Sequence, residues 1–535
     1  MRRVKESSPT RRGRLMSGAA VLALGSIVAK IIGAFHRVPL TNILGAEGMG
    51  IYQLVFPVYA LFITLSTAGI PTALSRLVAE HRARGEDARK YLAAALFTLL
   101  ALSVFAGALI VALSHVLAGW QGNPSAAPGY AVIAPAVVFS GIVAGLRGWF
   151  QGEMYMTPTA VSSVLEQLVK LGAGVGFALL FLPDGGSAAV SGALLGVTLS
   201  EFVAACYLII TYAVRTRRKG GAREGLRLDA EERKAMFHTA APIALLGVIV
   251  PLGAFSDSLI VVNALGWGGA DTASATAMYG LYSGPVTSLV NLPVVIAMSL
   301  AVAVVPSVSV SRAERDLGGV LSKSRMSVKL IYLIGVPSAL FLIIFGRDIL
   351  SLLYPALSAR EVLTAARLMS VAALGVVLTG ATQIYVSLLQ ALDRTKSAVK
   401  SLFCAVCVKV ILSLSLVPFI GVTGAAVAGV GMSAVSLVAV TAAFRRYTGE
   451  SAEKSVAQTL VCGVIMSLVA LPVREYVPTH IGAVLAGAAV CFVVYGWLTT
   501  LVGVFTESEC LALPFGSRLV RLRRIIRFWE NEYER

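Results

Sequence analysis

Ionisable side chains lie inside segments of this sequence that are otherwise apolar. Lys30 stands in the run SIVAKIIGAF, and Arg37 follows the end of that run. A charge near the centre of a bilayer costs at least about 2.5–3.5 kcal/mol, so such residues usually face an internal cavity or an ionic partner. Cations at such a place can hold an anion, and carboxylates can carry a proton or a sodium ion. The candidates are the cations Lys30, Arg37, Lys170 and Lys409 and the carboxylates Glu166, Glu201 and Asp257.

The candidates also have interpretations that need no ligand. Glu166 and Lys170 are four residues apart, so they share a helix face and can neutralise one another. Lys409 has no acidic residue nearby in its own segment and can pair instead with Glu201 or Asp257 from another span. The first lysine of the set can extend along its helix to the membrane surface beside the arginine that follows it.

The composition places these residues in a membrane protein. The 535-residue chain is 57% hydrophobic and 14% charged, with a mean hydropathy of +0.81, whereas soluble domains carry about 25% charged residues. Apolar segments of about 20 residues, the length that crosses a bilayer, recur from end to end. The sequence therefore predicts an all-α polytopic membrane protein. The first apolar segment is too long for a cleaved signal peptide and is predicted to be a true first span.

The apolar segments predict about fourteen transmembrane helices. If the N-terminus is cytoplasmic, the inside segments hold roughly 37 of the 45 lysines and arginines and the outside loops about five. Positive charge accumulates on the cytoplasmic side of membrane proteins, so both termini are predicted to be cytoplasmic. The predicted spans are 15–36, 51–75, 91–118, 129–150, 159–182, 187–214, 237–264, 277–306, 327–345, 366–390, 398–419, 422–444, 455–473 and 480–504.

The sequence contains an internal repeat. Aligned without gaps, FQGEMYMTPTAVSSVLEQLVK and LQALDRTKSAVKSLFCAVCVK match Gln151 with Gln390 and Lys170 with Lys409. Further on, SAAVSGALLG resembles TGAAVAGVGM. A repeat of six spans enters the membrane each time from the same side, which predicts parallel repeats about an axis along the membrane normal. Transporters built in this way bind substrate between the halves and alternate access by moving one half against the other.

The spans, the repeat and the charged segments predict the organisation of the chain. The C-terminal tail has apolar residues at helical spacing between arginines, which predicts an amphipathic helix on the inner membrane surface; a solvated basic tail is the alternative. The predicted parts are a basic cytoplasmic N-terminus at 1–14, a first lobe at 15–214, a basic cytoplasmic linker at 215–236, a second lobe at 237–447, two further spans within 455–504 and the cytoplasmic tail at 505–535.

Two stretches carry a family resemblance. KIIGAFHRVPLTNILGAEGMGIYQLVFPVYALFITLSTAGIPTALSRLVAEHRA and RGWFQGEMYMTPTAVSSVLEQLVK resemble the stage V sporulation protein B-like polysaccharide transporters. These belong to the multidrug/oligosaccharidyl-lipid/polysaccharide (MOP) exporter superfamily and are related to lipid II flippases. The resemblance covers roughly residues 13–505. It implies a V-shaped, MATE-like fold of two pseudo-symmetric six-helix lobes, with two extra C-terminal helices that receive a lipid tail.

The resemblance also implies a function, the flipping of a polyprenyl-pyrophosphate-linked sugar for peptidoglycan synthesis or sporulation. The implied partners are this lipid-linked oligosaccharide, membrane lipids and the cell-envelope synthesis machinery, with no nucleic acid, for a monomer in the bacterial plasma membrane. A cavity with cations on both walls suits a pyrophosphate, which carries two to three negative charges. We therefore expect the head group to bind Lys30, Arg37, Lys170 and Lys409, with Glu166, Glu201 and Asp257 coupling an ion or lining the cavity.

An enzyme is not expected, because the sequence has no P-loop or nucleotide-binding glycine motif and its histidines lack metal-ligand spacing. Cys404 and Cys407 have metal-like spacing but no second pair, so no metal and no cofactor are expected. The main rival is a cation-coupled (H⁺ or Na⁺) multidrug antiporter, which would use Asp257, Glu166 and Glu201. The sign of the cavity's charge separates the two functions. A non-transporting scaffold is a further alternative, although it has no reason to retain buried charges.

Overall fold

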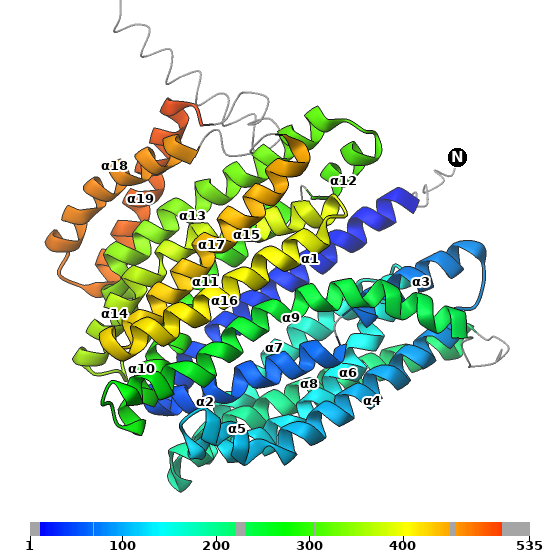
Figure 1. The fold of residues 1–535 in the computed structure, drawn as a ribbon, viewed down its shortest axis with the longest axis horizontal. Coiled ribbons are helices and arrows are strands. Elements are labelled where there is room, and N and C mark those ends of the chain that lie inside the picture. The colour runs from blue at the N-terminus through cyan, green and yellow to red at the C-terminus, as the bar shows by residue number, and fades with distance from the viewer. Residues whose placement is uncertain (1–10, 68, 220–229, 303–304, 450–455, 505–535) are drawn as a thin grey trace, which may run out of the picture. The chain divides into compact units, whose positions relative to one another are not determined.

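The protein is described from a computed structural model, in which every regular element of the described residues is a helix (Figure 1). The all-α class predicted from the sequence is thereby confirmed. The helices form two compact units, Met1–Gly284 and Pro285–Arg535. The predicted amphipathic tail and part of the predicted linker lie outside the described residues. The described ranges are 11–67, 69–219, 230–302, 305–449 and 456–504.

The first unit contains ten α-helices in its described residues. Its second helix has a non-helical residue, Gly45, and contains Pro57. The helices are α1 (Arg11–Phe35), α2 (Arg37–Thr67), α3 (Ile70–Arg84), α4 (Arg89–Ala112), α5 (Ser114–Trp120), α6 (Ala127–Gly152), α7 (Thr157–Leu180), α8 (Gly186–Lys219), α9 (Ala230–Trp267) and α10 (Thr272–Leu281).

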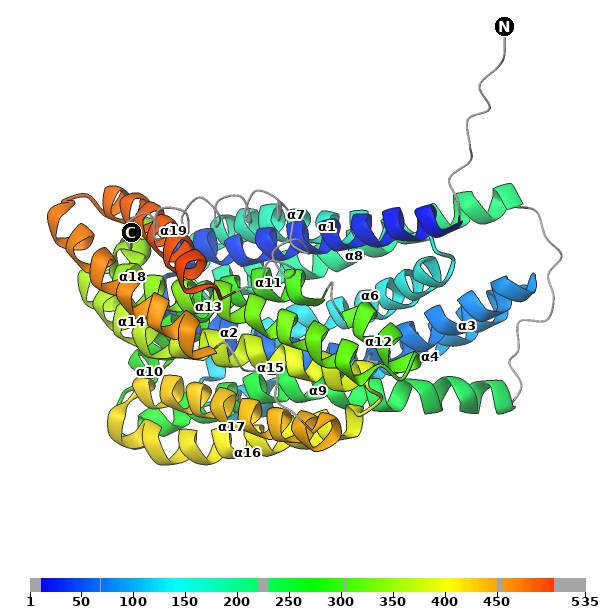
Figure 2. The same cartoon turned by 90° about the horizontal axis from the view of Figure 1, so that it is seen from above.

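Small residues let α1, α7 and α8 approach one another closely, and Figure 2 shows the three helices side by side. A Cβ atom added to Gly25 of α1 would lie 2.7 Å from the Cβ of Ala160 in α7. A Cβ added to Gly196 of α8 would lie 2.3 Å from the Cα of Gly174 in α7. Such small-residue seams are typical of membrane helices, because van der Waals packing drives their association.

A second close contact joins α2 and α10. A Cβ on Gly50 would lie 2.1 Å from the carbonyl oxygen of Thr276, and a Cβ on Gly280 would lie 2.1 Å from that of Ala46. Next to this contact, Tyr279 donates a hydrogen bond to the carbonyl of Gln53 at 3.2 Å. Two glycines and a hydrogen bond therefore bind the first part of the predicted eighth span to the second span.

The loop between α5 and α6 holds this region together. Gln121 donates to the carbonyl of Leu54 in α2 at 2.9 Å and to the hydroxyl of Ser258 in α9 at 3.0 Å. Asn123 donates to the hydroxyl of Thr276 in α10 at 2.9 Å. Both amides are buried, and buried amides need such partners. Hydrogen bonds from this loop thus join α2, α9 and α10, which are far apart in the sequence. The charge distribution predicts that this end of the first unit lies outside the cell.

The second unit contains nine α-helices in its described residues. It begins within a π-helical turn, Tyr282–Val286, that includes Pro285. The helices are α11 (Thr287–Val302), α12 (Val305–Ala313), α13 (Leu317–Leu353), α14 (Ala359–Ala372), α15 (Leu374–Ala391), α16 (Thr395–Ile420), α17 (Val422–Thr448), α18 (Val456–Tyr476) and α19 (His480–Val502).

Twelve segments of the described residues are long and apolar enough to cross a membrane. The first of them, Leu24–Arg84, runs through both of the first two predicted spans. The eighth predicted span, 277–306, includes the second half of α10, the π-helical turn with Pro285, all of α11 and the start of α12. The exact number of fourteen stays a prediction. The predicted lobe boundaries also stay predictions, and the division into compact units falls within the eighth span.

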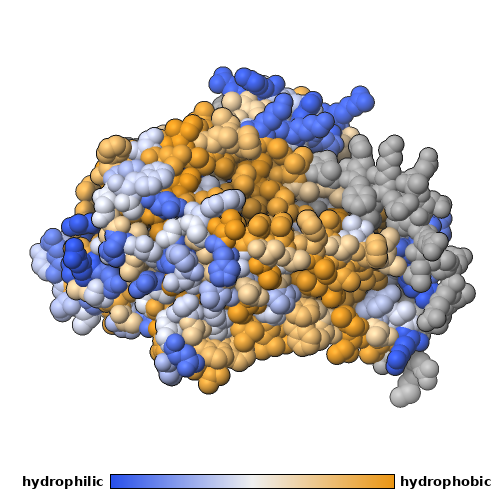
Figure 3. All heavy atoms as spheres, turned by 60° about the horizontal axis from the view of Figure 1, so that its bottom comes forward, coloured by the Kyte–Doolittle hydropathy of each residue, from blue (hydrophilic) through white to orange (hydrophobic). Residues whose placement is uncertain are grey.

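Large apolar side chains are exposed along these helices. Phe97 is 77% exposed, Phe419 85% and Phe492 82%. Figure 3 shows hydrophobic residues over much of one face of the molecule. Soluble proteins rarely expose contiguous apolar patches of more than a few hundred Å². The exposed apolar surface and the long apolar helices together describe a multi-span membrane protein.

The turn at the aligned glutamines is the same in both units. Met154 (φ 57°) and Asp393 (φ 52°) adopt the left-handed conformation, which is uncommon for residues other than glycine. Each lies three positions after its aligned glutamine and donates its backbone N–H to that glutamine's carbonyl, with Gln151 and Gln390 both accepting at 3.0 Å. The turn therefore supports the alignment of the repeat, including the match of the two lysines that follow.

A carboxylate anchors α18 and α19 to α13. Asp348, near the end of α13, forms an ion pair through Oδ2 with Arg474 Nε at 3.2 Å, and its Oδ1 contacts His480 Nδ1 at 2.7 Å. The two partners lie at the end of α18 and the start of α19, so one buried carboxylate binds both helices of the hairpin.

The predicted orientation can be tested by cysteine labelling in intact cells. Cysteines at Gly186 and Gly268 are expected to react with a membrane-impermeant reagent, and a cysteine at Gly220 is not. Gly122 is a poor choice for the outer label, because its φ is +76° and a Cβ there would lie 2.8 Å from Asn263 Oδ1. Labelling at residue 220 in intact cells would contradict the orientation.

Candidate functional site

The first candidate, Lys30, is exposed on α1. At 100° per residue, its position lies on the far side of the helix from a stripe of exposed apolar residues. The flank between them carries Gly25, Ala29 and Gly33 and packs towards α7. The apolar stripe is the side of α1 that suits contact with lipid, whereas the opposite side, which carries Lys30, does not suit such contact. The stripe consists of Val21, Leu24, Val28, Ile31 and Phe35, each at least 40% exposed.

Lys170 occupies a similar position on α7. The exposed apolar side of this helix includes Val161, Leu168 and Leu179, and Lys170 lies on the opposite side. Its ammonium nitrogen lies 4.5 Å from the centroid of the Phe56 ring in α2. Among the described residues, Lys170 makes no ion pair. An aromatic face attracts a cation but carries no net negative charge that would neutralise it.

Lys409, the repeat partner of Lys170, is buried on α16 and only 7% exposed. Phe403, Ile411 and Leu414 mark the exposed apolar side of that helix, and Lys409 lies on the opposite side. The two lysines that the repeat aligns are therefore equivalent within their own helices. The pairing of Lys409 with a carboxylate of the first unit stays an alternative prediction, as does a shared cavity.

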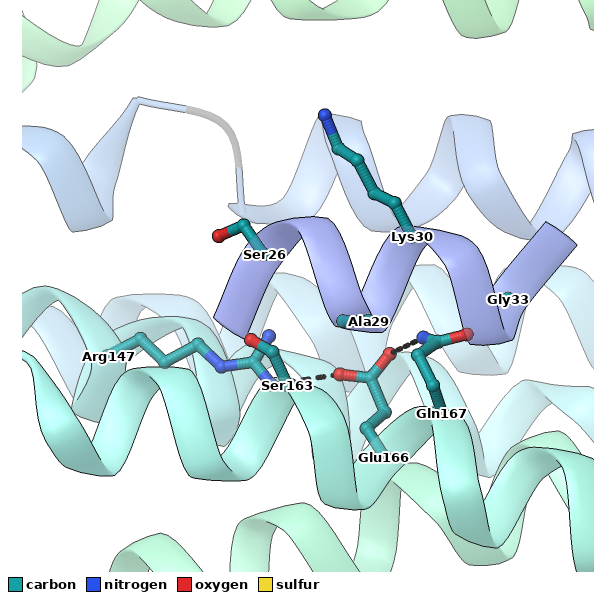
Figure 4. A pocket seen from close by; sticks show the side chains of 8 residues that line it. All are labelled: Ser26, Ala29, Lys30, Gly33, Arg147, Ser163, Glu166 and Gln167. Carbon is teal, nitrogen blue, oxygen red and sulfur yellow. Dashed lines mark hydrogen bonds and ion pairs between the residues drawn. The ribbon is translucent and has the colours of Figure 1, made fainter. Parts of the chain in front are cut away.

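Among the described residues, Glu166 forms no ion pair with Lys170, so the ion pair that their spacing allows is not the one found. Glu166 Oε2 instead accepts from Arg147 Nη2 of α6 at 2.9 Å, and Oε1 accepts from Gln167 at 2.9 Å (Figure 4). These groups line a cavity of about 320 Å³ between α1 and α7. Lys30 also lines this cavity, but its side chain points away from the ion pair.

The other two carboxylates are buried and also have polar neighbours. Glu201 of α8 is 8% exposed and accepts a hydrogen bond from Tyr59 of α2 at 3.2 Å. Asp257 of α9 is 8% exposed and precedes Ser258, which receives the hydrogen bond from Gln121. Glu201 thus contacts α2, whereas Asp257 lies next to a residue that contacts the loop between α5 and α6.

Arg37 begins α2, directly after the buried His36. Its Nη1 donates to the backbone carbonyl of Ser283 at 3.5 Å, and Gln53 donates to the same carbonyl. Ser283 lies in the π-helical turn that follows α10. The arginine therefore connects the junction of α1 and α2 to the interrupted eighth span.

Arg147 is the functional candidate that the sequence did not reveal. It stands in the run GIVAGLRGWFQG, three residues before the predicted end of the fourth span at 150. A long basic side chain so close to a predicted span end can extend to the membrane surface, so the sequence predicts no partner for it. The helix continues to Gly152, and the arginine binds Ser162 and Glu166 of the next helix. The signal in the sequence was an arginine with apolar residues on both sides.

Family models identify the chain. The polysaccharide biosynthesis protein model matches residues 15–312, more than half of the sequence. The chain belongs to the polysaccharide biosynthesis protein family. The model of the lipid II flippase MurJ matches residues 174–488, so the ranges matched by the two family models overlap. The resemblance to polysaccharide transporters expected from the sequence is confirmed.

Curated relatives of this polysaccharide biosynthesis family member cover nearly the whole chain. Stage V sporulation protein B of Bacillus subtilis (strain 168) is 27% identical over 523 residues, which cover 95% of this chain and 97% of the relative. The lipid II flippase MurJ of the same organism is 24% identical over 483 residues, which cover 86% of this chain and 88% of the relative.

Solved structures share the fold. A lipid II flippase MurJ in an inward closed conformation has a TM-score of 0.70 and 14% identity, covering 90% of this chain and 99% of that chain. An inward-facing multidrug resistance MATE family transporter of the MOP superfamily has a TM-score of 0.66 and 16% identity, covering 80% and 98%. The MATE-like fold class expected from the sequence is therefore confirmed.

Proposed function

We propose that this family member flips a polyprenyl-pyrophosphate-linked sugar across the bacterial plasma membrane by alternating access. The observation that carries the proposal is the position of Lys30 and Lys170. Both lie on helix sides opposite exposed apolar stripes, and neither has an ion-pair partner among the described residues. Membrane cations are costly, so retaining two of them without a carboxylate partner points to an anionic cargo.

The chemistry of the cargo fits these groups. A pyrophosphate accepts charge-assisted hydrogen bonds from ammonium and guanidinium groups, which are about twice as strong as neutral hydrogen bonds. Arg37 adds a guanidinium next to α1, and Lys409 supplies the equivalent cation in the second unit. The name of the Bacillus relative MurJ, a lipid II flippase, supports a cargo of the lipid II type, and the name of stage V sporulation protein B supports a role in sporulation. The protein itself acts as a monomeric transporter without catalysis, in cell-wall synthesis or sporulation.

A multidrug antiporter is the alternative function with the same fold. The side chains of the candidate site support it less well than they support a flippase. Exchange of H⁺ or Na⁺ for a cationic drug requires membrane carboxylates that can release their partners. Glu166 has both oxygens engaged by Arg147 and Gln167. Glu201 and Asp257 remain as coupling candidates, and a gradient of ions, of potential or of substrate can drive either transporter.

Complementation tests the proposed cargo. Expression of this gene is expected to restore growth to a bacterial strain depleted of its lipid II flippase. A variant with Lys30→Glu and Lys170→Glu, checked for equal membrane abundance, is expected not to restore growth. Failure of the wild-type protein to support growth, together with transport of a cationic dye by the same protein, would favour the antiporter instead.

A further inference from the structure

Arg147 binds Glu166 from a neighbouring helix and orients it. Its Nη2 lies 2.9 Å from Glu166 Oε2, and its Nε donates to Ser162 Oγ at 3.0 Å. Gln167 donates to the second carboxylate oxygen at 2.9 Å. Figure 4 shows the arginine reaching from α6 to the carboxylate beneath α1. Both oxygens of the acid are therefore occupied by partners other than the lysine one turn away.

Local helix geometry favours a different pair. A glutamate four residues before a lysine is the favourable orientation for an ion pair on a helix. Glu166 and Lys170 have this spacing, yet no ion pair joins them among the described residues. The ammonium of Lys170 lies over the ring of Phe56 instead, 4.5 Å from its centroid. Glu166 therefore pairs with Arg147 of α6 and not with Lys170 of its own helix, α7.

We propose that Arg147 is a positioning residue that preserves a positive charge on this side of α7. By holding Glu166, it leaves Lys170 without a carboxylate partner and so available to an anionic ligand. Without Arg147, the carboxylate would pair with Lys170 and neutralise its charge. The pairing itself is independent of the ligand, whereas a pyrophosphate as the ligand rests on the proposed function.

Thermal unfolding of the full-length protein in detergent tests the pairing without any ligand. The coupling between Glu166→Gln and Lys170→Gln is measured by a double-mutant cycle, once with Arg147 present and once with Arg147→Gln. We expect the coupling to be larger with Arg147→Gln, because Glu166 and Lys170 form their ion pair only then. Equal coupling in the two backgrounds, or a larger coupling with Arg147 present, would overturn the proposal.

Equilibrium binding of geranylgeranyl pyrophosphate tests the consequence for an anionic ligand. Arg147→Gln is expected to weaken binding about tenfold, equivalent to about 1.4 kcal/mol. The double variant Arg147→Gln/Glu166→Gln is expected to recover most of this loss, because no carboxylate remains to neutralise Lys170. A purely structural role for Arg147 predicts that the double variant binds no better than the single one, and this result would overturn the proposal.

A second arginine of the same unit provides the matched control. Arg215 of α8 also forms an ion pair with a helix-end carboxylate, Glu153, at 3.8 Å. Arg215→Gln is expected to leave pyrophosphate binding and the Glu166–Lys170 coupling unchanged. If the wild-type protein does not bind the probe, the proposed function is wrong, and the thermal cycle still decides the role of Arg147.

Discussion

Lys30→Glu is expected to lower the rate at which the proposed cargo, a lipid-linked sugar, crosses the membrane by about a hundredfold or more. The loss of one charge-assisted contact costs about 1.5–3 kcal/mol. At about 1.4 kcal/mol per factor of ten, Lys30→Ala alone weakens binding about tenfold to a hundredfold. The glutamate adds repulsion of the pyrophosphate to that loss. Lys30→Arg is expected to retain part of the activity, because the charge remains while its geometry changes.

Flipping of a fluorescent lipid-linked sugar in proteoliposomes measures this effect. Lys170→Ala and Lys409→Ala are expected to show losses similar to that of Lys30→Ala. Lys400→Glu is the control, because Lys400 is exposed on the same helix as Lys409 but is separate from the candidate site. If Lys30→Ala and Lys409→Ala reach normal abundance and flip substrate at the wild-type rate, cations do not bind the cargo, and the antiporter becomes the better proposal.

Gly280→Leu is expected to destabilise the first unit by about 1–3 kcal/mol or more, the usual cost of overpacking. A Cβ at this position would lie 2.1 Å from the carbonyl oxygen of Ala46 and 2.5 Å from the backbone nitrogen of Gly50. Backbone atoms cannot move aside as a flexible side chain does, so α2 and α10 must separate. Thermal unfolding in detergent measures the loss of stability.

Cysteine accessibility reports the separation of the two helices directly. Thr276 is fully buried between them, so a cysteine there is expected to react only in the Gly280→Leu variant. Gly50→Leu should have a similar effect, and the double variant should be less than additive because the two glycines share one contact. Gly266→Leu is the control, because its Cβ would meet no atom within 4 Å. Equal melting temperatures for Gly266→Leu and Gly280→Leu would contradict the close-contact explanation.

The sequence by itself determined the class of the protein and showed which charged residues lie inside apolar segments and which lie between them. Hydropathy is a local property, because each span must be apolar over its own length to cross the bilayer. The sequence also showed the repeat, since its two copies carry a glutamine and a lysine at the same separation, Gln151 with Lys170 and Gln390 with Lys409. The turn that follows these glutamines has a left-handed residue at the same position in both units, in agreement with the alignment.

The tertiary structure alone decided which charges have partners. Spacing within α7 favours Glu166 with Lys170, but Arg147 of another helix binds the acid, and no local pattern encodes that contact. The approach of Gly50 to Gly280 is of the same kind, because the two glycines are 230 residues apart in the sequence. Periodicity shows which side of a helix a residue occupies, and only the packing of neighbouring helices determines what that side meets.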